Sequence, residues 1–227
     1  MTNPPPNTGT PPNAGRAADT PPNAGRAADT PLNAGRAADT PLNAGRAGEP
    51  ARASRVETHP DPNDIAWVEH QLGRLPRGIV SIAARCPCGC PTVVRTLPRL
   101  PDGVPFPTSF YATCPRLTGA ISTLESLGMM REMSERLEQD EDLAAAYRSA
   151  HEDYLARRLE LGNVPEIDGI SAGGMPTRVK CLHVLVAHSL AAGPGVNPLG
   201  DEALAALPEW WSDGCCDGTT GLRSGQR

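Results

Sequence analysis

The stretch GIVSIAARCPCGCPTVVRTLP, residues 78–98, predicts two β-strands joined by a cysteine-rich turn. Residues 78–85 are mainly apolar and are typical of a first strand, and residues 92–97 are typical of a second. The proline and glycine residues of the intervening Cys86–Pro91 segment indicate a turn. A third strand is expected at residues 108–113, after an irregular loop that is rich in proline. Three such strands in a row predict a small antiparallel sheet.

Helices are expected after the third strand. The clearest helix runs from Asp140 to Leu161, because its apolar residues fall on one stripe at steps of four, three, four and seven. Another helix is expected to begin at Pro176 and to end at Gly193, since proline suits the first position of a helix. We therefore predict an α+β fold, in which a three-stranded antiparallel sheet packs against four or five helices.

The N-terminal part of the chain differs in composition from the rest. Residues 10–49 contain four copies of a ten-residue unit, TPPNAGRAAD, and the last two copies carry Leu in place of one Pro. The unit has no aromatic or β-branched apolar residue, so it cannot offset an ordering cost of about 1–2 kcal/mol per residue. We predict a disordered repeat tail at residues 1–57, a single α+β domain at 58–212 and a disordered C-terminal tail at 213–227.

Charge and hydropathy argue against several classes of protein. The formal net charge is −5, whereas proteins that bind nucleic acids in general carry a basic surplus. No apolar run reaches the roughly 18 residues that a membrane span requires. The N-terminus lacks the basic and then apolar pattern of a secretory signal. We therefore expect a cytoplasmic protein that contacts neither membrane nor nucleic acid.

Seven cysteines are the most informative residues for function. Their odd number and the expected compartment argue against a disulfide framework and favour reduced thiols, a metal site or a redox site. They are Cys86, Cys88, Cys90, Cys114, Cys181, Cys215 and Cys216. If the strands form a meander, the first strand ends, the second begins and the third ends at one rim of the sheet. This topology brings the three cysteines of the turn and Cys114 together, and a tetrahedral metal ion needs about four such ligands.

A metal ligand from another part of the chain can be sought among Cys181, His183 and His188. On an ideal helix, Cys181 and His183 lie about 200° apart, so they cannot bind one ion unless the helix is distorted. Cys181 and His188 share a face but lie roughly 10 Å apart along the axis. We favour Cys181. The predicted metal ligands, for zinc or an iron–sulfur cluster, are Cys86, Cys88, Cys114 and Cys181. Buried cysteines that act as small apolar side chains and a redox thiol pair are the alternatives.

A glycine-rich segment is a second candidate site. Ser171–Pro176 runs into the helix that is expected to start at Pro176, and helix N-termini bind phosphate and carboxylate groups. The predicted anion-binding residues are Gly173, Gly174, Arg178 and Lys180. The segment is not a phosphate-binding loop of the P-loop or dinucleotide type. A plain loop that needs flexible glycines is the alternative.

Residues from about 60 to 212 resemble a bacterial, mainly actinobacterial, family known as domain of unknown function number five hundred and one. The resemblance is carried by the motifs RCPCG (85–89), RLPDGVPFPT (99–108), TCPR (113–116), AYRSAHEDY (146–154), ISAGGMPTRVKCLH (170–183) and NPLGD (197–201). It agrees with the choice of the four predicted metal ligands, whereas Cys90 departs from the family's usual pattern. The family brings no established activity. Its genes often lie near a septum-formation initiator and an exopolyphosphatase.

The leading functional hypothesis is a cysteine-ligated metal site with a binding or regulatory role, because no catalytic base or nucleophile is apparent in the sequence. The first alternative is an enzyme that acts on a phosphorylated small molecule or polyphosphate and holds this anion near Arg178 and Lys180. The second alternative is an interaction protein associated with cell division. Whether the protein is an enzyme is left open by the sequence.

Overall fold

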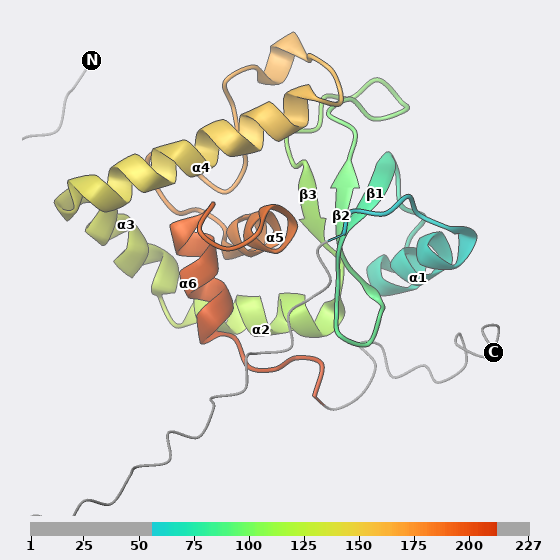
Figure 1. Ribbon diagram of the computed structural model, residues 1–227, viewed down its shortest axis with the longest axis horizontal. Coiled ribbons are helices and arrows are strands. Elements are labelled where there is room, and N and C mark those ends of the chain that lie inside the picture. Colours follow the sequence, from blue (N-terminus) through green and yellow to red (C-terminus); the bar gives the residue numbers. More distant parts are fainter. Residues whose placement is uncertain (1–55, 213–227) are drawn as a thin grey trace, which may run out of the picture. The chain divides into compact units, whose positions relative to one another are not determined.

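The computed structural model describes residues 56–212 of the chain. In this part, three strands and six α-helices form the α+β fold that the sequence predicts, with one helix more than expected (Figure 1). The elements are α1 (Pro62–Leu72), β1 (Ile79–Arg85), β2 (Pro91–Thr96), β3 (Phe110–Ala112), α2 (Pro115–Ser126), α3 (Met129–Gln139), α4 (Glu141–Leu159), the 3-10 helix η1 (Pro165–Ile167), α5 (Leu182–Ala192) and α6 (Pro198–Ala206).

The sheet is the predicted antiparallel meander. Its strand order is β1-β2-β3, and both neighbouring pairs are antiparallel. Val93 in the central strand pairs with Ala84 of β1 and with Ala112 of β3. The end of β1, the start of β2 and the end of β3 therefore lie at one rim, as the cysteine argument requires.

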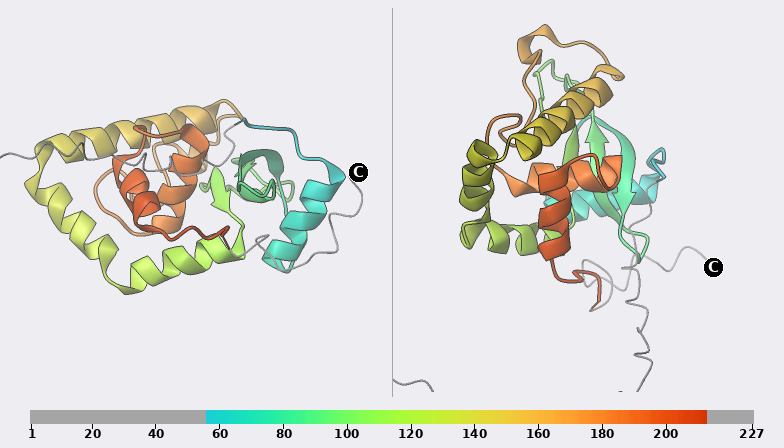
Figure 2. Two further views of the ribbon diagram at one scale, coloured as in Figure 1. Left: turned by 60° about the horizontal axis from the view of Figure 1, so that its bottom comes forward. Right: turned by 60° about the vertical axis from the view of Figure 1, so that its left-hand side comes forward.

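Helices cover the sheet on both faces. α1 lies on one side and α5 on the other (Figures 1 and 2). Val68 of α1 packs with Ile82 and Val94 of the sheet. On the α5 side, Val93 and Leu185 belong to the large core cluster that the remaining helices complete. Alternate residues of a strand point to opposite faces, which explains why neighbouring Val93 and Val94 enter different clusters.

α5 is the central helix of the domain. Eight of its side chains are buried, including those of Leu182, Leu185 and His188, and a helix that is apolar all round is typical of a core position. Burial of each Leu or Val contributes about 1.5–3 kcal/mol. α6 approaches α5 closely at Gly200, where a Cβ atom would overlap the carbonyl oxygen of Leu185 and Oγ of Ser189. A side chain at this position would therefore separate the two helices.

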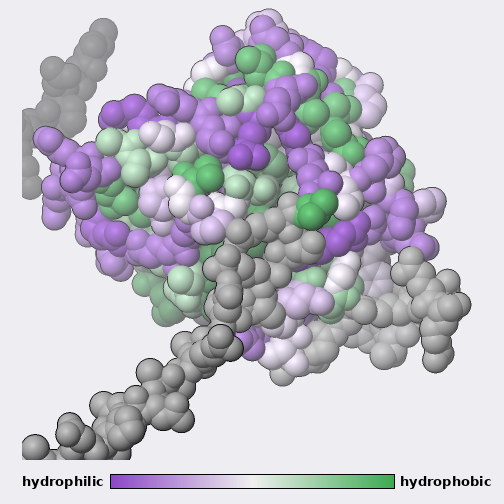
Figure 3. All heavy atoms as spheres, viewed as in Figure 1, coloured by the Kyte–Doolittle hydropathy of each residue, from purple (hydrophilic) through white to green (hydrophobic). Residues whose placement is uncertain are grey.

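α4 agrees with its prediction to within two residues at each end. Asp140 caps it by accepting a hydrogen bond from Leu143 N at 2.9 Å. Tyr147, Ala150 and Tyr154 of the predicted apolar stripe are fully buried. Polar side chains dominate the visible outer side of the helix (Figure 3). The stripe thus orients α4 with its charged side outward.

The predicted helix start at Pro176 is wrong. The helix begins six residues later, at Leu182, and residues 176–181 are turns and extended chain. Hydrogen bonds from other elements hold this segment: Val179 N donates to Ser134 Oγ at 3.0 Å, and Tyr147 Oη donates to the Arg178 carbonyl at 3.2 Å. These tertiary contacts override the local helix signal.

The predicted tails lie almost entirely outside the described residues, as do Cys215 and Cys216. Glu57, which the prediction assigns to the N-terminal tail, lies inside the described part and forms an ion pair with Arg95 at 3.2 Å. Among the helices of residues 56–212, none has both the length and the apolar character that a membrane span requires.

Candidate metal centre

The Cys86–Cys90 segment is a tight turn between β1 and β2. Cys86 N donates to the Cys90 carbonyl at 3.0 Å, and Gly89 N donates to the Cys86 carbonyl at 2.8 Å. Gly89 has a φ of 87°, which only glycine adopts readily. The sulfur atoms of Cys86, Cys88 and Cys90 all lie within 4.8 Å of one another. Since Zn–S bonds are about 2.3 Å long, sulfurs that share one ion lie at most about 4.6 Å apart, which is close to this upper limit.

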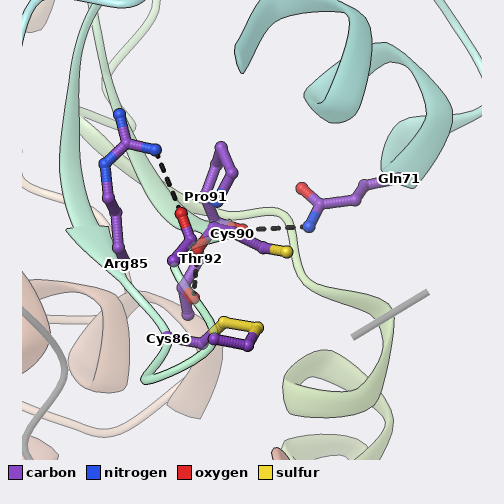
Figure 4. The surroundings of a disulfide bond; sticks show 8 residues. Gln71, Arg85, Cys86, Cys90, Pro91 and Thr92 are labelled. Atoms are coloured by element: carbon purple, nitrogen blue, oxygen red, sulfur yellow. Dashed lines mark hydrogen bonds between the residues drawn. A yellow bond between two sulfur atoms is a disulfide. The ribbon is translucent and has the colours of Figure 1, made fainter. Parts of the chain in front are cut away.

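The cluster is largely shielded from solvent. The Cys86 and Cys90 residues are 2% and 6% exposed, and Cys88 is half-buried. Cys86 and Cys88 are joined by a disulfide, so the expectation of reduced thiols does not hold for this pair (Figure 4). A metal ion is bound by thiolates, not by disulfide sulfurs. With this disulfide formed, Cys86 and Cys88 offer no thiolate to a metal ion.

Arg85 holds the turn from the side of α1. Its two terminal nitrogens donate to Oδ1 and Oδ2 of Asp64 at 2.6 and 2.7 Å, and one of them also donates to the Gly89 carbonyl at 3.2 Å. Gln71 Nε2 donates to the Pro91 carbonyl at 2.9 Å (Figure 4). Two side chains thus fix the start and the end of the cysteine turn.

Arg85 carries a positive charge beside the cysteine turn. The hydrogen bond with Asp64 raises the pKa of Arg85 against the effect of burial, so the guanidinium is charged. Arg85 also interacts electrostatically with Cys90. Burial alone raises the pKa of Asp64, but hydrogen bonds from Arg85 and the Asp61 amide outweigh it, and the net pKa lies below the usual range.

Cys114 lies at the predicted rim. It lies two residues after the end of β3, directly precedes α2 and is fully buried. Thr113 N donates to the Thr92 carbonyl at 2.9 Å, which continues the ladder between β2 and β3 toward the cysteine turn. The backbone topology that predicted a shared rim is therefore confirmed.

Cys181 lies in a second group of side chains. Its sulfur, a ring nitrogen of His183 and a carboxylate oxygen of Glu125 lie within 4.8 Å of one another. The helical angle expected between Cys181 and His183 does not apply, because Cys181 has extended backbone and α5 begins at Leu182. Sequence reasoning missed Glu125, since nothing in the local pattern links the end of α2 to the start of α5.

His188 is a core residue. Its Nε2 donates to Asp153 Oδ1 at 2.9 Å, and Nδ1 accepts from Asn197 Nδ2 at 3.3 Å. The ring stacks on Phe110 with centroids 5.7 Å apart, and burial lowers its pKa despite the nearby carboxylate. Asp153 of α4 therefore pairs with a buried imidazole.

The glycine-rich segment forms a tight turn before α5. Lys180 N donates to the Gly173 carbonyl at 2.7 Å, and Arg178 N donates to the Gly174 carbonyl at 3.2 Å. A Cβ on Gly174 would lie 2.7 Å from the Arg178 carbonyl oxygen, which accounts for the glycine. The side chains of Arg178 and Lys180 are exposed. The start of α5 holds a carboxylate of the protein itself, because Leu182 N donates to Glu125 Oε1 at 2.7 Å.

Fold and site together define a small α+β domain with a cysteine cluster at one rim of its sheet. The chain belongs to the family described as protein of unknown function (DUF501), whose model matches residues 82–205. The resemblance seen in the sequence is thus confirmed, and α1 with Asp64 lies outside the matched range. No curated protein and no solved structure matches the chain.

Proposed function

We propose that the Cys86–Cys90 turn is a zinc-binding site with a structural or regulatory role. The observation that carries this proposal is the mutual proximity of three sulfur atoms on one short turn. Thiolates select soft metal ions, and zinc accepts three or four of them in tetrahedral geometry. A binding role follows from the burial of the cluster, because structural zinc sites are closed whereas catalytic ones keep an open position.

Cys114 is the fourth ligand that we propose. It is buried at the same rim of the sheet as the turn, and it opens α2, where backbone N–H groups favour a thiolate. Cys181 is better assigned to its group with Glu125 and His183. A site built from these four cysteines would tie the β1–β2 turn to the start of α2.

The disulfide gives the proposed site a dependence on redox state. Formation of the Cys86–Cys88 bond removes two of the four ligands, so the reduced form is the one that binds zinc. A regulatory role would follow if the two forms present different surfaces to a partner. The polyphosphate alternative rests on the residues near Arg178 and Lys180 and on gene context, and the cell-division alternative rests on gene context. Both stay predictions.

Zinc content tests the proposal. The full chain, without a histidine tag, is purified anaerobically with reductant. Its zinc content per chain is then measured by elemental mass spectrometry. We expect about one zinc per chain and a loss of it in Cys88→Ser and Cys90→Ser. Cys181→Ser is the matched control and should keep its zinc. Reduced protein without metal, or zinc that is lost only in Cys181→Ser, would overturn the proposal.

A further inference from the structure

The group of side chains at the start of α5 combines three kinds of metal ligand. Cys181, His183 and Glu125 each offer one ligand atom, and these atoms all lie within 4.8 Å of one another. Thiolate sulfur, imidazole nitrogen and carboxylate oxygen are the ligand types that zinc takes from proteins. His183 Nδ1 lies 3.2 Å from Glu125 Oε1. A nitrogen and an oxygen that share one tetrahedral zinc ion lie about 3.3–3.5 Å apart, so this pair is already spaced as two ligands of one ion.

Further hydrogen bonds orient two of these side chains. His183 Nε2 lies 3.2 Å from the Thr118 carbonyl oxygen, which can only accept, so Nε2 carries a proton and Nδ1 is left to bind an ion. A histidine that binds a metal typically donates its other ring N–H to a carbonyl or a carboxylate, which fixes the ring. Glu125 is held as well, because its Oε1 accepts from the Leu182 amide at 2.7 Å. Both side chains thus have the outer hydrogen bonds that support metal ligands.

The same group stabilises positive charge. Cys181 and Glu125 raise the pKa of His183 to about 9 against the effect of burial, so without a metal ion the ring is an imidazolium at neutral pH. It forms an ion pair with Glu125, and the two side chains are 28% and 22% exposed. A metal ion on Nδ1 takes the place of the proton there, because nitrogen and sulfur ligands bind in their deprotonated forms.

An open cleft borders the group. It has a volume of about 540 Å³ and is bounded by α1, the β3 strand, α2 and the start of α5. Cys181 and His183 line it, and no other described residue of its lining is a Cys, His, Asp or Glu. The fourth position of an ion at this place is therefore left to water or to a small molecule in the cleft. Three protein ligands and one open position are typical of zinc sites that bind or activate a small ligand.

We propose that Cys181, His183 and Glu125 form a second zinc site, with one position open to the cleft. This site is separate from the one at the cysteine turn and shares no ligand with it. Three protein ligands and a water hold an ion less tightly than four thiolates, since thiolates are the ligands that zinc prefers. We therefore expect the second site to lose its ion during purification and to fill when metal is supplied.

Cobalt(II) chloride tests this site, because cobalt replaces zinc and shows a sulfur-to-metal absorption band. The full chain, without a histidine tag, is stripped with chelator in its disulfide form, in which Cys86 and Cys88 offer no thiolate. Added cobalt should bind at about one ion per chain and give the band, and Cys181→Ser should abolish it. His183→Gln and Glu125→Gln should weaken cobalt binding about tenfold or more, since even the loss of an outer hydrogen bond typically costs 10–100-fold.

Controls separate this site from the turn and from loss of folding. His151→Gln, which changes a histidine on α4, should bind cobalt as the unmodified chain does, and circular dichroism shows whether each variant is folded. In the unmodified chain, added imidazole should change the visible spectrum of bound cobalt, because it takes the open position. An unchanged spectrum would refute that open position.

Three outcomes would overturn the second site itself. They are the absence of the band with excess cobalt, a band that persists in folded Cys181→Ser, and a band that is lost in Cys90→Ser instead, which would place the ion at the turn. Because the disulfide is kept throughout, failure here leaves the zinc site of the reduced turn untouched.

Discussion

Asp64 of α1 and Arg85 of β1 form a two-pronged ion pair, with N–O distances of 2.6 and 2.7 Å. Arg85 directly precedes Cys86 and also binds the Gly89 carbonyl, so the pair connects α1 to the cysteine turn. The geometry of the proposed zinc site therefore depends on a residue that lies outside the matched family range. This dependence can be tested by substitution and by pH.

Asp64→Asn should destabilise the domain by about 1.5–3 kcal/mol, because it removes a charge-assisted hydrogen bond from a largely buried pair. Urea unfolding followed by circular dichroism measures the effect. We also expect weaker zinc binding in this variant, since the turn loses its anchor. Exposed Asp142→Asn on α4 is the control. An unchanged urea midpoint in Asp64→Asn would show that the pair contributes little.

The same pair predicts an acid dependence. The pKa of Asp64 is lowered in the folded protein, so its contribution to stability is present above the unfolded value of about 4 and is lost as the pH falls through the lower folded value. The difference in unfolding free energy between the unmodified chain and Asp64→Asn should therefore shrink below about pH 4. A difference that stays constant down to acid unfolding would contradict the shift.

Alkaline pH should weaken the folded state through His183. Its pKa of about 9 lies above the unfolded value of about 6.5, so its contribution is complete below pH 6.5 and is lost as the pH rises through 9. The stability of the unmodified chain relative to His183→Gln should fall across this window. The pKa of His151 is lowered by burial, so His151→Gln should show no such loss. Parallel curves for His183→Gln and the unmodified chain would be inconsistent with the ion pair.

Close packing of α5 and α6 should make Gly200→Ala destabilising by about 1–3 kcal/mol or more, since the added Cβ overlaps the Leu185 carbonyl oxygen. Gly119 offers a matched control within α2, because a Cβ there meets nothing within 4 Å. Gly119→Ala should stabilise the domain by about 0.5–1 kcal/mol through its higher helix propensity. Urea unfolding of the two variants should thus give shifts of opposite sign, and similar shifts would refute the packing argument.

Much of the fold could be predicted because its signals are local. The apolar runs before and after the cysteine turn define β1 and β2, and the meander follows from their order. The stripe through Tyr147 and Tyr154 defines α4 for the same reason. Cys86, Cys88 and Cys90 share one turn, so their proximity needs only a correct hairpin.

The parts that sequence reasoning missed depend on contacts between distant residues. Residues 176–181 leave the helical conformation because Ser134 and Tyr147 bind their backbone, and neither partner is visible in the local pattern. Glu125 reaches Leu182 across 57 positions of the chain. Cys181 and His183 come close together because α5 begins after Cys181, whereas the sequence predicted a helix start at Pro176.

Zinc-edge X-ray absorption of the anaerobically reduced, full-length chain tests the proposed metal centre most directly, because it reports the atoms bound to the ion. The account predicts a first shell dominated by sulfur at about 2.3 Å. A shell made only of nitrogen and oxygen at about 2.0–2.1 Å would contradict the account.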